Sequence, residues 1–273
     1  MKLSKALEMV VRTDPGMVRS HNEDAVFVDP GLGIAILADG MGGYNAGEVA
    51  SGIATTLLAT NFSQKIPQYV ADAGGFSAFS SAGEFLAQEV SQANMAVYNT
   101  SQNQPQYAGM ATTLVVAWFY DNRMLVGHLG DSRLYRLRGN VFEQLTKDHS
   151  LLQEQLDSGM ITLEEAQHSQ NKNLVTRGLG VDPEVETEIH DYEVLVDDVF
   201  LICSDGLSDM VSDAEIASLL RDPDGDLSMV ADSLVQTANE HGGRDNISVI
   251  LVKIKGGYPS PSGWWQKLLA RLM

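Results

Sequence analysis

The hydrophobic residues of the chain recur with two different periods, which predict a mixture of strands and helices. Alternating or continuous apolar runs predict strands at residues 8–13, 25–29, 34–38, 112–120, 123–129, 133–137, 141–145, 199–204 and 247–254. Apolar residues three and four positions apart predict helices at residues 46–58, 82–100, 149–157, 162–167, 213–221 and 227–240. Pro67 and the pair Gly74-Gly75 predict a loop over residues 62–80.

Two of the predicted strands form a hairpin that carries a carboxylate on each strand at its open end. Residues 25–29 and 34–38 flank Pro30-Gly-Leu-Gly33, a turn sequence. Asp24 precedes the first strand and Asp39 follows the second, so antiparallel pairing brings both side chains to the same end. Glycines at 40, 42 and 43 follow Asp39, and glycine lets the backbone come close to a bound ion.

A second pair of aspartates flanks strands near the C-terminus. The strand 199–204 ends at Asp205, and Asp245 directly precedes the strand 247–254. Because the chain crosses through two predicted helices and re-enters at the same end, these strands are expected to be antiparallel and to bring the two aspartates together. If both sheets face the same way, four carboxylates converge, and such a cluster stays ionised only when cations neutralise it.

Ligands that are all oxygens select Mg²⁺ or Mn²⁺ over Zn²⁺ or copper. Two such cations can clamp a phosphate for in-line attack by an activated water. Arg19 precedes Asp24 by five residues, and its guanidinium could hold a phosphate oxygen through paired hydrogen bonds.

The composition narrows the class of protein. The 273 residues are ample for a sizeable core, and the net charge of −18 should repel nucleic acids as a whole, so we expect no nucleic-acid partner. Cys203 is the only cysteine, which excludes an internal disulfide and predicts a buried strand residue. No apolar stretch approaches the roughly 20 residues of a membrane span, and the N-terminus is unlike a signal peptide. We therefore expect a cytoplasmic protein, and a monomer.

Five short motifs stand in an order that is typical of one enzyme family. They are Arg19…Glu23-Asp24, Ala38-Asp-Gly-Met-Gly-Gly43, Gly130-Asp-Ser-Arg133, Ser204-Asp-Gly206 and Arg244-Asp-Asn246. Each alone is weak because Asp-Gly is common in turns. Together, over about residues 8–254, they resemble the metal-dependent type 2C (PPM) serine/threonine protein phosphatases, in particular the short bacterial members. The resemblance implies an α+β fold, a four-layer α-β-β-α sandwich with two central antiparallel sheets.

The resemblance also implies a centre of two Mn²⁺ or Mg²⁺ ions, with a weaker third, at the ends of the sheets. Asp39 resembles the ligand that bridges the two ions, and the carbonyl of Gly40 joins one of them. Asp205 and Asp245 resemble the ligands of the other ion. Asp131 resembles the ligand of the third ion.

The catalytic residues that the resemblance implies are Arg19 as the phosphate clamp, Asp24 as an acceptor for metal-bound water, and the bridging Asp39. Met41 stands where many eukaryotic members have a histidine, and a methionine cannot donate a proton. The general acid is then either a metal-bound water or His168, a candidate substrate-binding residue. His168 lies in a stretch that resembles the bacterial flap, although its surroundings lack the family's usual proline and arginine; an ordinary exposed histidine is an equal alternative.

The activity implied is hydrolysis of phosphoserine and phosphothreonine by direct attack of a metal-bound hydroxide. The implied partners are phosphorylated proteins and a cognate bacterial Ser/Thr kinase. One alternative is a two-metal phosphatase of small phosphate esters. Another is a non-catalytic relative that binds phosphoproteins, which the loss of a metal aspartate would indicate; none of these aspartates is lost.

The composition changes after the last predicted strand. We expect a catalytic domain at residues 1–255, a Gly/Pro/Ser linker at 256–263 and an amphipathic tail at 264–273. In a helical tail, one half would carry Trp264, Trp265, Leu268, Leu269, Leu272 and Met273. Ten residues are too few for a stable free helix, so the tail should dock on its own domain, a partner protein or a membrane surface.

Overall fold

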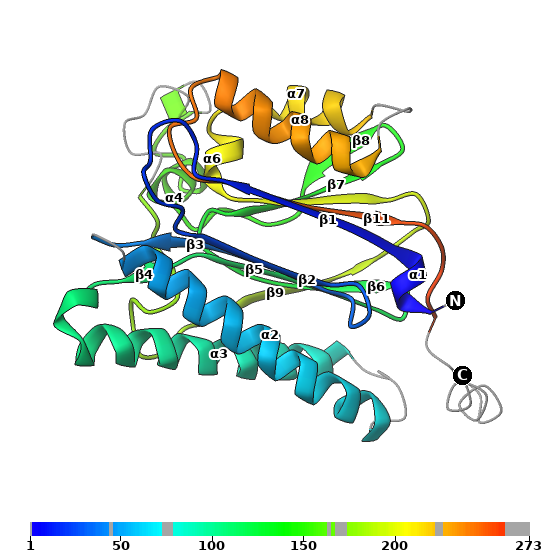
Figure 1. The fold of residues 1–273 in the computed structure, drawn as a ribbon, viewed down its shortest axis with the longest axis horizontal. Coiled ribbons are helices and arrows are strands. Elements are labelled where there is room, and N and C mark those ends of the chain that lie inside the picture. The colour runs from blue at the N-terminus through cyan, green and yellow to red at the C-terminus, as the bar shows by residue number, and fades with distance from the viewer. Residues whose placement is uncertain are drawn as a thin grey trace.

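Two antiparallel sheets lie face to face, and helices cover their outer faces (Figure 1). The computed structural model of the protein describes residues 2–43, 46–72, 79–162, 165–166, 174–221 and 226–259. The layers follow the order helix, sheet, sheet, helix, which confirms the predicted α+β sandwich. Within the described ranges, no helix is long and apolar enough to cross a lipid bilayer.

The first sheet joins the two ends of the domain. Its strands lie in the order β1 (Leu7–Asp14), β11 (Ile247–Ile254), β10 (Val199–Cys203), β7 (Arg133–Arg138) and β8 (Val141–Gln144). β1 pairs with β11 along its whole length, from Leu7 opposite Ile254 to Asp14 opposite Ile247. The last strand of the chain is therefore an interior strand, between the first strand and β10.

The second sheet contains the predicted hairpin. Its strands lie in the order β2 (Asp24–Asp29), β3 (Ile34–Met41), β5 (Leu114–Tyr120), β6 (Arg123–Leu129) and β9 (Glu188–Glu193), with the short β4 (Ala111–Thr112) paired to the end of β3. Continuous apolar runs in β3 and β5 are buried on both faces, as expected for strands between two layers.

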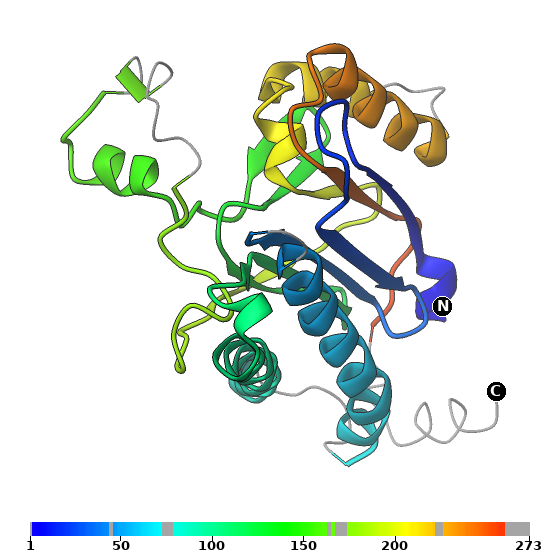
Figure 2. The same cartoon turned by 60° about the vertical axis from the view of Figure 1, so that its left-hand side comes forward.

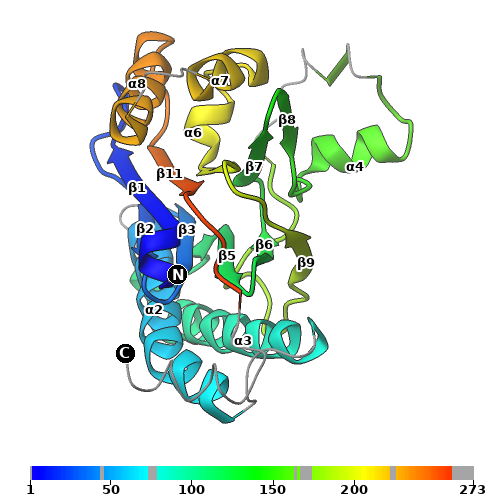
Figure 3. The same cartoon turned by 90° about the vertical axis from the view of Figure 1, so that its right-hand side faces the viewer.

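Long helices cover the second sheet, and shorter ones cover the first (Figures 1 and 3). The helices are α1 (Leu3–Ala6), α2 (Ala46–Asp72), α3 (Phe79–Asn103), α4 (Leu151–Asp157), α6 (Asp205–Ser208), α7 (Asp213–Leu220) and α8 (Leu227–Glu240), with a 3-10 turn at Pro105–Tyr107. Helices α2 and α3 pack on the second sheet, whereas α7 and α8 pack on the first. A third apolar cluster fills the space between the sheets.

The predicted loop at residues 62–80 is wrong over its whole described length. Helix α2 continues through Pro67 to Asp72, and α3 begins at Phe79. The proline removes one backbone hydrogen bond from the helix. Phe62 and Ile66 extend the apolar face of α2 into the core, and this burial offsets that loss.

Strand β9 and helices α1 and α6 were not predicted. Half of the predicted helix at 162–167, together with His168, lies outside the described residues. The tail at 264–273 also lies outside them.

Candidate active site at the ends of the two sheets

The hairpin β2–β3 brings its two aspartates together as predicted. Asp24 and Asp39 are direct partners in the register of the two strands. Beyond Asp39, β3 continues in the same register, with Gly40 opposite Thr112 of β4, which directly precedes β5. Thr113, between β4 and β5, donates its backbone N–H to the carbonyl oxygen of Asp39 at 2.8 Å, so the end of β3 is held against the neighbouring strand.

The first sheet contributes its aspartates to the same cleft as Asp39. Figure 2 turns toward the viewer the end of the sandwich where β3 ends and α6 begins. Asp205 begins α6, directly after Ser204 and the end of β10. Asp245 lies two residues before β11, which is antiparallel to β10, so the two side chains come from adjacent strand ends. Asp131 lies in the turn between β6 and β7, which joins one sheet to the other.

These carboxylates line one cleft of about 260 Å³. The residues around it are Arg19, Glu23, Asp39, Gly40, Met41, Gly42, Thr113, Asp131, Val175, Asp205 and Asp245. The structure thus brings together all the predicted metal ligands and Arg19. Asp24 is not part of the cleft wall and lies beneath it, beside Asp39.

The cleft concentrates negative charge in a poorly hydrated space. Burial raises the pKa of Asp39 well above its usual range, and the nearby charges of Asp24 and Asp205 raise it further. Burial, with the charges of Asp131 and other neighbours, likewise raises the pKa of Asp205. The pKa of Asp131 rises to about 6, mainly through burial. Burial and mutual repulsion therefore oppose the ionised forms of these carboxylates, and a bound cation would counter that effect.

Asp24 occupies a buried position with one oxygen bonded and one without a partner. Ser204 Oγ donates a hydrogen bond of 2.9 Å to Asp24 Oδ2. Asp24 Oδ1 is buried and has no hydrogen-bond partner among the described residues. Burial raises the pKa of Asp24 to about 7, although hydrogen bonds from Ser248 and Ser204 oppose the rise.

Close backbone contacts explain two of the motif glycines. A Cβ at Gly40 would lie 2.1 Å from the carbonyl oxygen of Gly47, at the start of α2. A Cβ at Gly206 would lie 2.0 Å from the carbonyl oxygen of Asn246, beside Asp245. Any side chain at either position would push the aspartate-bearing segments apart.

Arg19 lies at the rim of the cleft and is paired with a carboxylate. Its Nη2 donates a hydrogen bond of 2.7 Å to Asp245 Oδ2, while about half of the arginine side chain remains exposed. The guanidinium therefore reaches the cleft, but part of its hydrogen-bonding capacity is directed at a predicted metal ligand.

Comparison with known proteins identifies the family. The family model described as Protein phosphatase 2C matches residues 18–251. The chain belongs to the protein phosphatase 2C family.

The relatives of this phosphatase 2C chain include named bacterial enzymes. It is 37% identical over 245 residues to "Serine/threonine phosphatase stp" of Listeria welshimeri, covering 89% of this chain and 94% of that protein. It is 36% identical over 251 residues to "Protein phosphatase PhpP" of Streptococcus pneumoniae, covering 91% and 98%.

Solved structures agree with the sequence relatives. Stp1 from Staphylococcus aureus aligns with a TM-score of 0.83 at 33% identity, covering 94% of this chain and 98% of that one. The catalytic domain of the phosphatase PstP in complex with 2 manganese ions aligns with a TM-score of 0.79 at 36% identity, covering 92% and 99%.

The donor set of this phosphatase 2C chain fits hard divalent cations. The cleft offers carboxylate oxygens, supplemented by the backbone at Gly40, and a bound cation would favour the ionised forms of Asp39 and Asp205, whose pKa values burial raises. The unpartnered Asp24 Oδ1 leaves an acceptor beneath Asp39. Oxygen ligands in this arrangement suit Mn²⁺ or Mg²⁺.

Sequence reasoning missed several residues that belong to the cleft, among them Glu23 and Thr113. Glu23 lines it, and burial raises the pKa of its carboxyl group. Thr113 also lines it and accepts the backbone N–H of Asp39 at 3.0 Å, so it holds the strand end in place. Glu23 had a signal, because it stands inside a quoted motif next to Asp24. Thr113 lies within a hydrophobic strand region and had none.

Met41 lines the cleft, where it offers a thioether and no proton donor.

Proposed function

We propose that the protein is a metal-dependent phosphoprotein phosphatase that hydrolyses phosphoserine and phosphothreonine. The observation that carries this proposal is the convergence of Asp39, Asp131, Asp205 and Asp245 with Arg19 in one cleft. Membership of the phosphatase 2C family and relatives that are named serine/threonine phosphatases support it.

Each carboxylate has a proposed role in holding metal. Asp39 and the carbonyl of Gly40, from the second sheet, would hold one ion, and Asp39 with Asp205 and Asp245 from the first sheet would hold a second. Asp131 would hold a weaker third ion. When bound, Mn²⁺ or Mg²⁺ supplies the positive charge that activates water and neutralises the phosphate. The related PstP domain with 2 manganese ions supports this assignment.

Asp24 and Arg19 handle the proton and the phosphate in this proposal. Asp24 Oδ1 has no partner among the described residues, so it is the atom available to accept a hydrogen bond from the attacking water. Its other oxygen is fixed by Ser204, which sets the orientation of the carboxyl group. The guanidinium of Arg19, which donates to Asp245 at the rim of the cleft, would bind the phosphate oxygens.

The proposed partners are phosphorylated proteins and a cognate Ser/Thr kinase whose products this phosphatase reverses. We also propose residues 1–255 as the catalytic domain, followed by the linker at 256–263. Neither the substrate role of His168 nor the docking of the tail at 264–273 enters this proposal, since both lie outside the described residues.

The test compares substrates and metal together. Turnover of phosphoserine and phosphothreonine peptides is measured beside that of a small aryl phosphate, each with Mn²⁺ and with EDTA. We expect Mn²⁺-dependent hydrolysis of the peptides, with no turnover in EDTA. Hydrolysis of the small ester without the peptides would instead favour a small-molecule phosphatase. Binding of phosphopeptides without turnover would favour a non-catalytic relative.

A further inference from the structure

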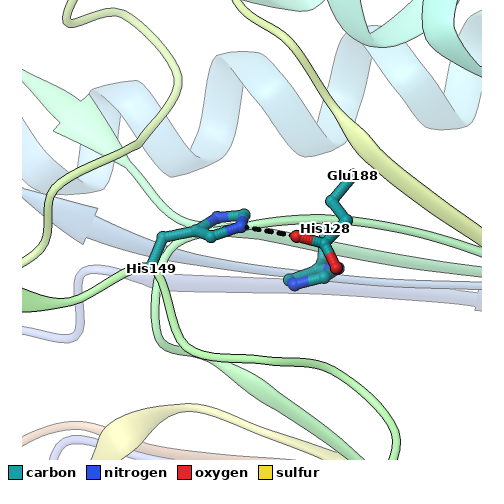
Figure 4. Close-up of side chains that lie close together, drawn as sticks. All are labelled: His128, His149 and Glu188. Atoms are coloured by element: carbon teal, nitrogen blue, oxygen red, sulfur yellow. Dashed lines mark hydrogen bonds and ion pairs between the residues drawn. The ribbon is translucent and has the colours of Figure 1, made fainter. Parts of the chain in front are cut away.

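Three histidines and a glutamate cluster near the cleft, and the proposed chemistry does not use them. His128 is on β6, Glu188 and His190 are on β9, and His149 lies two residues before α4. The possible ligand atoms of His128, His149 and Glu188 lie within 4.8 Å of one another (Figure 4). Imidazole and carboxylate groups so close together could form a site for a transition metal.

The hydrogen bonds of His149 argue against a metal at this cluster. The N–H of Gly130 lies 3.2 Å from His149 Nδ1, and because an N–H only donates, Nδ1 is an acceptor without a proton. The proton of the neutral ring is therefore on Nε2, which donates to Glu188 Oε2 at 3.0 Å. With both ring nitrogens engaged, His149 has no free lone pair for a metal.

The same contacts hold the His149 ring in one orientation. Glu188 Oε1 also bonds to His190 Nε2 at 2.7 Å. Burial tends to raise the pKa of Glu188, but the hydrogen bonds from His190 and His149 outweigh it and lower that pKa to about 2, so the group is a carboxylate at neutral pH. The ring of His149 stacks on His128, with centroids 4.8 Å apart and planes 9° apart.

His149 connects this cluster to two walls of the cleft. Its backbone N–H donates to Gly130 O at 2.9 Å, so Gly130 is bonded to His149 through both its N–H and its carbonyl. Gly130 has a φ of +97° and immediately precedes Asp131. On the other side, Thr176 N–H donates to His149 O at 2.8 Å, beside the cleft residue Val175.

We propose that His149 is a positioning residue: Glu188 orients its ring, and its Nδ1 holds the Gly130 N–H to fix the turn that presents Asp131 to the cleft. This inference rests on the proposed function, because the position of Asp131 affects activity only if that carboxylate holds a cation. His149 contributes the shape of this turn, and that shape is present before any metal binds.

Two substitutions test the two nitrogens of the imidazole ring separately. His149→Asn keeps an oxygen near the position of Nδ1, so it retains an acceptor for the Gly130 N–H. His149→Gln keeps an N–H near the position of Nε2, so it can reach Glu188 but offers Gly130 no acceptor. His190→Gln is the matched control, since it changes the half-exposed partner of the other Glu188 oxygen.

Two measurements are made on each variant. Amide hydrogen exchange of Gly130 is followed by NMR in the metal-free protein, and the Mn²⁺ concentration for half-maximal activity is measured separately. In His149→Gln both the exchange rate and that Mn²⁺ concentration should rise about tenfold, the scale of one buried N–H left unpaired. His149→Asn and His190→Gln should stay within about twofold of the wild type.

Equal effects of the Asn and Gln substitutions, or unchanged Gly130 exchange in His149→Gln, would overturn the proposal. If His149→Gln does not fold, Glu188→Ala replaces it, because the ring then loses the acceptor that orients it. Gly130 exchange should rise in that variant, and an unchanged rate would also overturn the proposal. A wild-type protein with no Mn²⁺-dependent turnover would refute the proposed function, whereas the exchange measurement would still decide the role of His149.

Discussion

Removing the metal should leave a protein whose stability falls as the pH rises from 5 to 8. Burial raises the pKa of Asp24 from 3.8 to about 7 in the folded chain, whereas the unfolded chain releases this proton near pH 4. Between these values the folded state binds more protons, so the free energy of unfolding decreases with pH. This stabilisation is fully present below about pH 4 and is lost as the pH passes about 7.

The expected size follows from the two pKa values. Between pH 5 and pH 8, the contribution of Asp24 to the free energy of unfolding should fall by roughly 2–3 kcal/mol. Asp131, whose pKa rises to about 6, acts in the same direction. His128 acts in the opposite direction, because burial lowers its pKa and its neutral form is favoured at higher pH. A comparison with Asp24→Asn reports the contribution of Asp24 together with its effect on Asp39, since an amide neither titrates nor carries charge.

The assay is urea unfolding of the wild type and Asp24→Asn at pH 5, 6, 7 and 8, in EDTA and in excess Mn²⁺. In EDTA the free energy of unfolding of the wild type should fall by about 2 kcal/mol more than that of the variant between pH 5 and pH 8. With Mn²⁺ the slope should reverse, because the cation binds ionised carboxylates, and at about 100 times its dissociation constant it adds roughly 3 kcal/mol. Parallel pH slopes of the two proteins in EDTA would refute this reasoning.

Three further outcomes are expected. Asp39→Asn and Asp205→Asn should each abolish turnover, while circular dichroism shows a folded protein. After treatment with EDTA, Mn²⁺ should restore the activity of the wild type only. Activity in a verified metal-free sample would contradict this expectation. Arg19→Ala should raise KM about tenfold, the scale of a lost charge-assisted hydrogen bond, without changing metal content. Ser132→Ala and Cys203→Ser should retain activity, and mass spectrometry should find no phosphorylated enzyme, since water attacks directly.

The positions of the predicted metal ligands could be read from the sequence because they depend on local rules. The hairpin signal fixed Asp24 opposite Asp39, and the register confirms it. The antiparallel relation of the strands after Asp205 and Asp245 followed from the direction of the chain, and it is also confirmed.

What the sequence could not reveal depends on contacts between distant segments. Strand β9 is an edge strand of polar and apolar residues, and its place is set by pairing with β6 and by the ion pair of Arg123 with Asp191. Pro67 was a misleading signal, because the packing of Phe62 and Ile66 in the core favours a helix up to this position, and α2 continues through it. The pairing of Arg19 with Asp245 spans most of the chain and left no local pattern.

The interior position of β11 has a consequence for the order of assembly during synthesis. The first strand, β1, finds its partner only when residues 247–254 have been made, because β11 separates it from β10. Asp24 and Asp39 meet each other early, within one hairpin. They meet Asp205 and Asp245 only after nearly the whole domain has left the ribosome. Such long sequence separation makes these contacts late events in folding. A nascent chain that ends before Asp245 would therefore have an incomplete set of metal ligands. Full metal binding would then occur only once the domain is complete.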